Sequence, residues 1–133
     1  MYPLTKDLIN KHCPNGPGIY KIYLCNLKGQ PMTIQRAFRK DESGLIYIGV
    51  SKTNLKNRIT MFRQVSSPKS TSTGHSGAQK YRELKPRLDK FFPNHQLYFE
   101  FEPLIDAVAS KEMESKLLTS VRFELGETPM LNG

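Results

Sequence analysis

The sequence predicts an α+β fold in which a small antiparallel sheet of about three to four strands is flanked by helices. Two segments rich in Ile and Tyr, residues 18–26 and 45–50, have the composition of buried strands. Residues 96–102 alternate apolar and polar side chains, which is typical of a strand with one wet face. Apolar residues recur at helical spacing in three further segments, residues 53–64, 78–92 and 107–125.

The strands of the first half are separated by turn signals. The strand at residues 18–26 ends at a turn over residues 26–29. Residues 31–40 then alternate weakly, and the next turn, residues 41–44, leads into the strand at 45–50. This order predicts an antiparallel meander in which residues 31–40 contribute a strand.

The first of the three helices follows the last of these strands. Leu55, Ile59 and Phe62 stand at positions i, i+4 and i+7, and Ser51 or Thr53 is available as the N-cap. Residues 65–77 are dominated by Ser, Thr, Pro and Gly, so we expect a mobile loop that is free to close on a ligand.

The second helical segment, residues 78–92, contains Pro86, which lacks a backbone donor and is expected to split the segment into two short helices. Residues 107–125 form the longest predicted helix. The chain has no internal repeat and no linker between two composition regimes, so residues 1–133 are expected to form a single domain.

Composition indicates a soluble protein with a core. Hydrophobic residues make up 38% of the 133, and no apolar run approaches the roughly 18 residues needed to cross a bilayer. Met1 to Cys13 lacks the apolar centre of a signal peptide, which favours a cytoplasmic location. Cys13 and Cys25 have no spacing typical of a zinc site and are expected to be inert thiols in a reducing compartment.

The formal charge of +8 is concentrated in the middle of the chain. Residues 52–90 contain ten Lys and Arg but only two acids, a distribution that indicates a polyanionic partner. The alternative is a solvated face that only keeps the protein soluble. Among the side chains of this region, the candidate nucleic-acid contacts are Lys52, Lys56, Arg63, His75, Lys80, Arg82 and Lys85.

Glu114 occupies an unexpected position in the last predicted helix. At 100° per residue it lies on the same face as Leu117 and Val121. A buried carboxylate must be paired, protonated or bound to a cation, because leaving it unpaired costs several kcal/mol. The alternative to a functional role is a salt bridge with an arginine at the core edge, for which Arg58 is the candidate.

Short motifs in this order resemble the GIY-YIG nuclease superfamily. They are the tripeptides Gly18-Ile19-Tyr20 and Tyr47-Ile48-Gly49, both in predicted strands, and Arg58 nine residues after the second. Glu114 followed by Leu117 and Leu118 is similar to the family's late helix, and residues 129–132, Pro-Met-Leu-Asn, are similar to its closing element. The resemblance covers residues 18–132.

The resemblance implies hydrolysis of phosphodiesters with one divalent metal, Mg²⁺ or Mn²⁺, held by Glu114. It implies that Tyr20 is the general base, and that Tyr47 orients water or phosphate in the same site. It implies that Arg58 stabilises the transition state. Asn132 would then bond active-site groups and fix the C-terminus.

The sequence also departs from the family pattern. Residues 21–46 contain an insertion with Arg36, Arg39 and Lys40, which would add a strand or a DNA-contacting flap. Phe62 stands where many members place a His or Tyr, and His75 is the substitute if a second proton-transfer group exists. The alternative for a histidine in such a loop is simple solvation.

These observations favour a small endonuclease acting on DNA, with RNA less favoured. The main alternative is a basic nucleic-acid-binding module that has the fold without cleavage. A protein-interaction domain is disfavoured by the concentrated charge. The biological role, whether restriction, repair, branch processing or mobility of an element, stays open.

Overall fold

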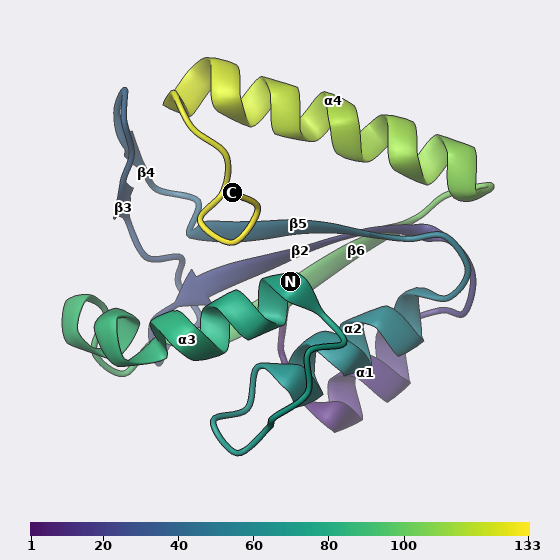
Figure 1. Ribbon diagram of the computed structural model, residues 1–133, viewed down its shortest axis with the longest axis horizontal. Helices are drawn as coiled ribbons and strands as arrows, with labels where there is room; N and C mark the ends of the chain where they lie inside the picture. The colour runs from purple at the N-terminus through teal and green to yellow at the C-terminus, as the bar shows by residue number, and fades with distance from the viewer.

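The computed structural model describes residues 1–133 and confirms the α+β class, with a four-stranded antiparallel sheet at its centre (Figure 1). The sequence predicts about three to four strands, and the sheet has four. In spatial order the strands are β1 (Tyr2–Pro3), β6 (Gln96–Pro103), β2 (Gly18–Cys25) and β5 (Leu45–Ser51).

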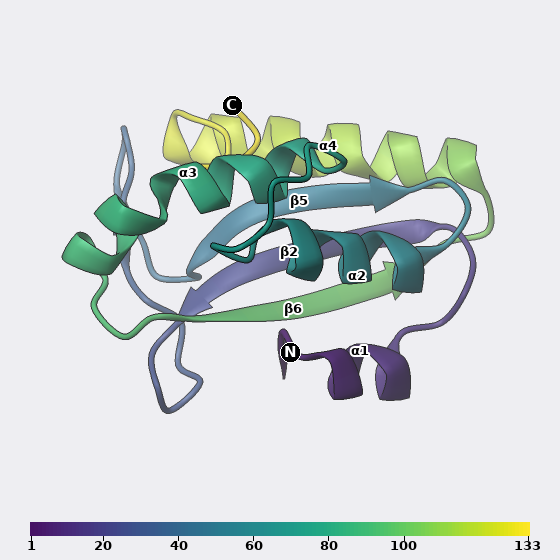
Figure 2. The ribbon, with the colours of Figure 1, turned by 60° about the horizontal axis from the view of Figure 1, so that its bottom comes forward.

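Helices cover both faces of the sheet (Figures 1 and 2). The larger core lies under three helices, and the smaller core lies under the fourth. The helices on the first face are α1 (Lys6–His12), α2 (Leu55–Val65) and α3 (Ser76–Phe91), and α4 (Ala107–Leu125) lies on the second.

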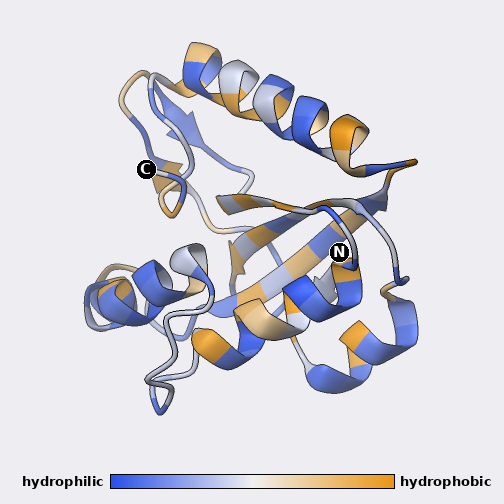
Figure 3. Ribbon diagram, turned by 45° about the vertical axis from the view of Figure 1, so that its right-hand side comes forward, coloured by the Kyte–Doolittle hydropathy of each residue, from blue (hydrophilic) through white to orange (hydrophobic).

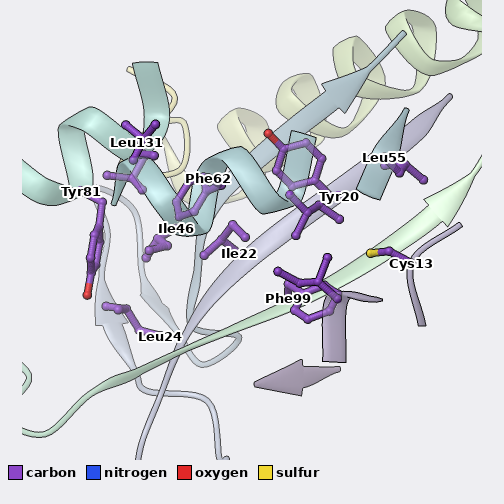
Figure 4. Packing of buried hydrophobic residues seen from close by; sticks show 14 of the residues in the cluster. Cys13, Tyr20, Ile22, Leu24, Ile46, Leu55, Phe62, Tyr81, Phe99 and Leu131 are labelled. Carbon is purple, nitrogen blue, oxygen red and sulfur yellow. The ribbon is translucent and has the colours of Figure 1, made fainter. Parts of the chain in front are cut away.

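Strand β2 supplies both cores because successive side chains of a strand point to opposite faces. Tyr20 and Ile22 belong to the larger core, whereas Tyr23 and Cys25 belong to the smaller one. Figure 4 shows Tyr20 with Phe62, Phe99 and other members of the larger core. The strand is thus buried on both faces, which explains its near-continuous apolar sequence.

The predicted meander is wrong, because β2 pairs directly with β5. Within the insertion, β3 (Ile34–Gln35) and β4 (Lys40–Asp41) pair only with each other and form a separate two-stranded sheet. These strands are two residues long, too short to replace a full-length partner of β2.

The insertion adds strands, which is one of its two expected forms, and it packs against the end of α4. The N–H of Phe38 donates to the carbonyl oxygen of Leu125 at 3.0 Å. The Arg36 guanidinium is buried and lies 4.0 Å from Asp41 and 3.6 Å from Glu127. A buried guanidinium between two carboxylates has a structural role, so it is not available to a DNA phosphate.

The expected break at Pro86 is also wrong, because α3 is one helix from Ser76 to Phe91 with the proline inside it. Pro86 itself is exposed, while Tyr81 before it and Leu88 after it are buried against the core. Packing on both sides of the proline therefore outweighs the loss of one backbone hydrogen bond.

Neither predicted cap of α2 is the observed one, and the helix begins one residue later than a cap at Thr53 would give. Asn54 is the N-cap, and its side chain accepts the N–H of Asn57 at 3.0 Å. Ser51 forms the turn before the helix, since its hydroxyl accepts the N–H of Asn54 at 2.8 Å. The first elements of the chain, β1 and α1, have no counterpart in the sequence prediction.

The C-terminal segment lies along the free edge of β5 (Figure 1). The N–H of Leu131 donates to the carbonyl oxygen of Ile46 at 2.9 Å. The Asn132 side chain accepts the N–H of Ile48 at 2.9 Å and donates to its carbonyl oxygen at 2.8 Å. The end of the chain therefore satisfies backbone groups that an edge strand leaves open.

Hydropathy follows the layers of the fold. Figure 3 shows hydrophobic stretches along the central strands and hydrophilic stretches on the outer turns of α1. None of the helices combines the length and the apolar character needed to cross a membrane.

Candidate active site

Tyr20 lies at the centre of the larger core on β2 and is 0% exposed. It pairs in register with Gly49 of β5, and its ring covers that glycine. A Cβ atom at position 49 would lie 2.4 Å from the Tyr20 ring carbon Cζ. The glycine of the second tripeptide therefore makes room for the tyrosine of the first.

Tyr47 lies beside Tyr20 on β5, with ring centroids 5.9 Å apart, and it is only half-buried. Its ring also packs against Phe62, 5.6 Å away, and covers Gly77 in the first turn of α3. A Cβ atom at position 77 would lie 2.5 Å from Cε1 of Tyr47. Sequence reasoning missed Gly77, although a glycine near the start of a helix is a signal of close approach.

His75 is not in an exposed loop, which corrects its prediction as a solvated residue and as a nucleic-acid contact. It is the N-cap of α3 and is 0% exposed. Its Nε2 atom lies 2.5 Å from the hydroxyl oxygen of Tyr20, and its Nδ1 accepts the N–H of Ala78 at 3.2 Å. The imidazole packs edge-on against Phe62 with 5.1 Å between ring centroids.

Burial controls the acid–base properties of this group. Desolvation, together with the nearby positive charge of Arg58, lowers the pKa of His75 to about 4. Desolvation also raises the pKa of Tyr20 well above its ordinary value and raises that of Tyr47. The charge of Arg58 acts in the opposite direction on both phenols. The arginine is therefore the group that favours an ionised oxygen here.

Arg58 extends from α2 towards these hydroxyls and is half-buried. Its Nη1 atom donates to the carbonyl oxygen of Gly74 at 3.3 Å, so the guanidinium also holds the segment that leads to His75. No carboxylate forms an ion pair with it. The guanidinium consequently keeps donors for an anionic ligand.

Glu114 lies on α4 with 16% of its side chain exposed, and its ion-pair partner is Lys111 at 3.6 Å. The predicted alternative, a salt bridge to Arg58, is wrong. The Lys111 side chain is 61% exposed, so this pair contributes little to stability. Burial and, to a smaller extent, the charge of this carboxylate raise the pKa of Tyr47.

Asn132 completes the surroundings of β5 through the backbone of Ile48, the residue after Tyr47. Its two polar side-chain atoms each make one hydrogen bond there. The expected anchoring of the C-terminus is therefore observed, and no hydrogen bond from this side chain reaches a tyrosine hydroxyl.

The predicted nucleic-acid contacts divide into two groups. In α3, Lys80 donates to the terminal Gly133 oxygen at 2.8 Å, Lys85 pairs with Asp89 at 2.8 Å, and Arg82 holds carbonyl oxygens of the 65–77 segment. These three cations have internal partners. Before and along α2, Lys52 is exposed and Lys56 and Arg63 are half-buried, with no ion-pair partner for any of them.

Comparisons of the chain with family models, curated proteins and solved structures found no match. The chemistry of the site is therefore inferred from its own residues. Two phenol oxygens, a histidine and a guanidinium without an ion-pair partner lie together on one face of the sheet, and the Glu114 carboxylate of α4 acts on the Tyr47 phenol. Such a set can bind an anion, accept a proton and hold a hard cation.

Proposed function

We propose that this chain is a metal-dependent endonuclease that hydrolyses DNA phosphodiester bonds. One observation carries the proposal: Arg58 acts on the hydroxyls of both Tyr20 and Tyr47, and the carboxylate of Glu114, from a fourth element, acts on that of Tyr47. Binding of a polyanion alone does not require a carboxylate near the anion-binding arginine and tyrosines, since it would repel phosphate. Hydrolysis with a bound cation uses both the arginine and the carboxylate.

Glu114 is a suitable ligand for Mg²⁺ or Mn²⁺. It is partly buried, and its only ion-pair partner is an exposed lysine that water can replace. The protein has no group of three or more acidic, His or Cys side chains that could hold a metal. Glu114 would thus be the protein ligand, with water and phosphate oxygens in the other positions, a shell that Mg²⁺ commonly keeps. When bound, the metal supplies a Lewis acid that polarises a phosphate oxygen.

The residues of the chain perform the remaining chemistry. The guanidinium of Arg58 donates to a non-bridging oxygen of the scissile phosphate and stabilises the charge that develops there. A water molecule attacks phosphorus, and its proton passes to an ionised phenol oxygen of the tyrosine pair. The bond from phosphorus to the leaving oxygen breaks as the new bond forms. Asn132 keeps β5, and with it Tyr47, at the edge of the sheet.

DNA is the proposed partner because cations with no ion-pair partner lie on and just before α2, the helix that carries Arg58. Lys52 and Lys56 stand before and at the start of α2, whose later residues include Arg58 and Arg63. Cations near the site neutralise neighbouring phosphates and release counterions on binding. A cytoplasmic location is part of the proposal, in keeping with two free, buried cysteines.

Incubation of the purified protein with supercoiled plasmid tests the proposal. Nicked or linear product should form with Mg²⁺ or Mn²⁺ and should be absent with EDTA. Linear duplex and branched DNA in parallel reactions identify the preferred substrate, and single-stranded RNA tests the less favoured alternative. If the protein binds DNA but does not cleave it under any metal condition, the nuclease proposal is wrong and the non-catalytic binding module is favoured.

The binding surface is tested with paired charge reversals. Lys52→Glu with Lys56→Glu should weaken duplex binding and reduce its dependence on salt. Lys6→Glu with Lys11→Glu, on α1, is the matched control and should have little effect. Equal losses in both double variants, measured by fluorescence anisotropy, would contradict this surface.

A further inference from the structure

The chain contains three histidines, and two of them are buried against a tyrosine hydroxyl. These two pairs stand at opposite ends of α3. His75 precedes the helix and contacts Tyr20 at 2.5 Å, whereas His95 follows it and contacts Tyr81 at 2.7 Å. In each pair the second ring nitrogen contacts the backbone, which fixes the position of the ring proton.

The backbone partner of His95 is a carbonyl oxygen. Its Nδ1 lies 2.9 Å from the oxygen of Phe92, and a carbonyl oxygen only accepts hydrogen bonds. The neutral ring therefore carries its proton on Nδ1. Its Nε2 is then an acceptor, and the Tyr81 hydroxyl donates to it.

The backbone partner of His75 is an N–H group, and the direction is reversed. The N–H of Ala78 donates to Nδ1, so this nitrogen must carry a lone pair. The neutral ring then has its proton on Nε2, and Nε2–H donates to the Tyr20 oxygen. The Tyr20 proton must find another acceptor. The guanidinium of Arg58 has no acceptor atom, whereas the neighbouring hydroxyl of Tyr47 can accept this proton in a hydrogen bond.

We propose that His75, Tyr20 and Tyr47 form a one-way chain of hydrogen bonds that makes the Tyr47 oxygen, rather than the Tyr20 oxygen, the acceptor of the proton from the attacking water. His75 donates to Tyr20, and Tyr20 donates to Tyr47. Tyr20 and His75 are positioning residues in this arrangement. The assignment rests on the proposed nuclease function, but the hydrogen-bond directions do not.

Exposure agrees with this assignment. Tyr20 is 0% exposed, so water does not reach its oxygen, whereas Tyr47 is half-buried at the edge strand. In the proposed chain, donation from Tyr20 stabilises an ionised Tyr47 oxygen, which opposes the effect of burial on the pKa of Tyr47. The charged groups acting on these phenols are Arg58 from α2, which lowers the pKa of Tyr47, and Glu114 from α4, which raises it.

The proton balance is simple. Tyr47 first loses its proton to solvent, and its phenolate accepts the hydrogen bond from Tyr20. The attacking water then transfers a proton to the Tyr47 oxygen while its own oxygen bonds to phosphorus, and the leaving oxygen departs and takes a proton from solvent. Tyr47 ends as a phenol and returns its proton to solvent.

The first test is independent of activity. Long-range ¹H–¹⁵N correlation spectra of the full-length protein distinguish protonated from bare ring nitrogens, and His75→Asn and His95→Asn assign the signals. His75 should be protonated on Nε2, and His95 on Nδ1. A neutral His75 protonated on Nδ1 would overturn the chain, whether or not the protein cleaves DNA.

The second test separates the two tyrosines by cleavage rate against pH. Tyr47→Phe should reduce the rate at least a hundredfold at every pH. Tyr20→Phe and His75→Asn, which keeps a capping side chain, should retain cleavage but move the rising limb of the profile to higher pH. Melting curves must show that each variant is folded. Loss of cleavage in Tyr20→Phe with activity kept in Tyr47→Phe would reverse the assignment, whereas no cleavage by the unchanged protein would refute the nuclease itself.

Discussion

The two ends of α3 use the same pair of side chains for different purposes. A helix leaves N–H groups unpaired at its N-terminus and carbonyl groups unpaired at its C-terminus. His75 stands at the first end and must accept a hydrogen bond, whereas His95 stands at the second and must donate one. The polarity of the helix therefore sets opposite tautomers and opposite directions for the two tyrosine hydroxyls.

The surroundings of the two pairs differ as well. The Tyr20 pair lies beside Arg58, Tyr47 and the charge of Glu114. The Tyr81 pair has a single charged neighbour, Asp89, at 3.6 Å from His95 Nδ1. The proposed hydrolysis requires a hydroxyl together with an anion-binding group and a cation-binding group, and only the first pair has such neighbours. The second pair closes the end of the helix.

The largest expected effect is at Glu114, which has no counterpart near Tyr81. Glu114→Gln should reduce plasmid cleavage about a thousandfold or more, because the metal ligand contributes several kcal/mol to the transition state. DNA binding without metal should hold or strengthen. The melting temperature should hold or rise, because the exposed Lys111 loses only a weak partner. Glu112→Gln, on the outer face of α4, is the control, and a Glu114→Gln protein that still cuts would contradict the metal assignment.

The pH dependence of stability should distinguish the two histidines. Because burial and Arg58 lower the pKa of His75 to about 4, the unfolded chain binds more protons between pH 4 and about 6.5. The stability that the neutral His75 provides is complete above pH 6.5 and is lost as pH falls through 4, about 3 kcal/mol in total. Urea unfolding at several pH values measures this slope. His75→Asn should flatten it, and an unchanged slope would show that His75 is not the group responsible.

Gly77→Ala tests the close packing of Tyr47 on α3. The added methyl would lie 2.5 Å from Cε1 of Tyr47 and should displace the ring, reducing cleavage roughly tenfold to a hundredfold. The control is Gly74→Ala, where the nearest atom is 3.4 Å away. If Tyr47 does not need its present position, Gly77→Ala should instead stabilise the helix with full activity, since alanine is the better helix former.

The smallest expected effect is at the other end of α3. Tyr81→Phe removes the hydroxyl that donates to His95 and leaves a buried acceptor without a partner, at a cost of about 1–3 kcal/mol. The rate of DNA cleavage at a temperature where the variant is folded should not change. A loss of cleavage with an unchanged melting temperature would mean that the two pairs are functionally alike.

Much of the fold was predictable because local pattern and burial coincide. The strands at residues 18–26 and 45–50 and the helix at 107–125 have clear apolar periods, and the structure contains all three. The partly buried Glu114 also follows from the helical period alone. These features depend on residues within a few positions of one another.

The errors arose where distant residues decide the local structure. Packing of α3 on the core keeps Pro86 inside one helix, and acids from two segments bury Arg36. His75 belongs to a segment whose composition predicts a solvated loop, yet it lies in the core because Tyr20, 55 residues earlier, provides its partner.

The sequence alone therefore determined most of the longer strands and helices and which side chains have unusual chemistry, because periodicity and residue type are local properties. The tertiary structure decided the direction of each hydrogen bond around those side chains. A histidine can donate or accept with either ring nitrogen, and only the group packed against it selects the tautomer. For His75 that group is the N–H of Ala78 at the start of α3, and for His95 it is a carbonyl oxygen at the end.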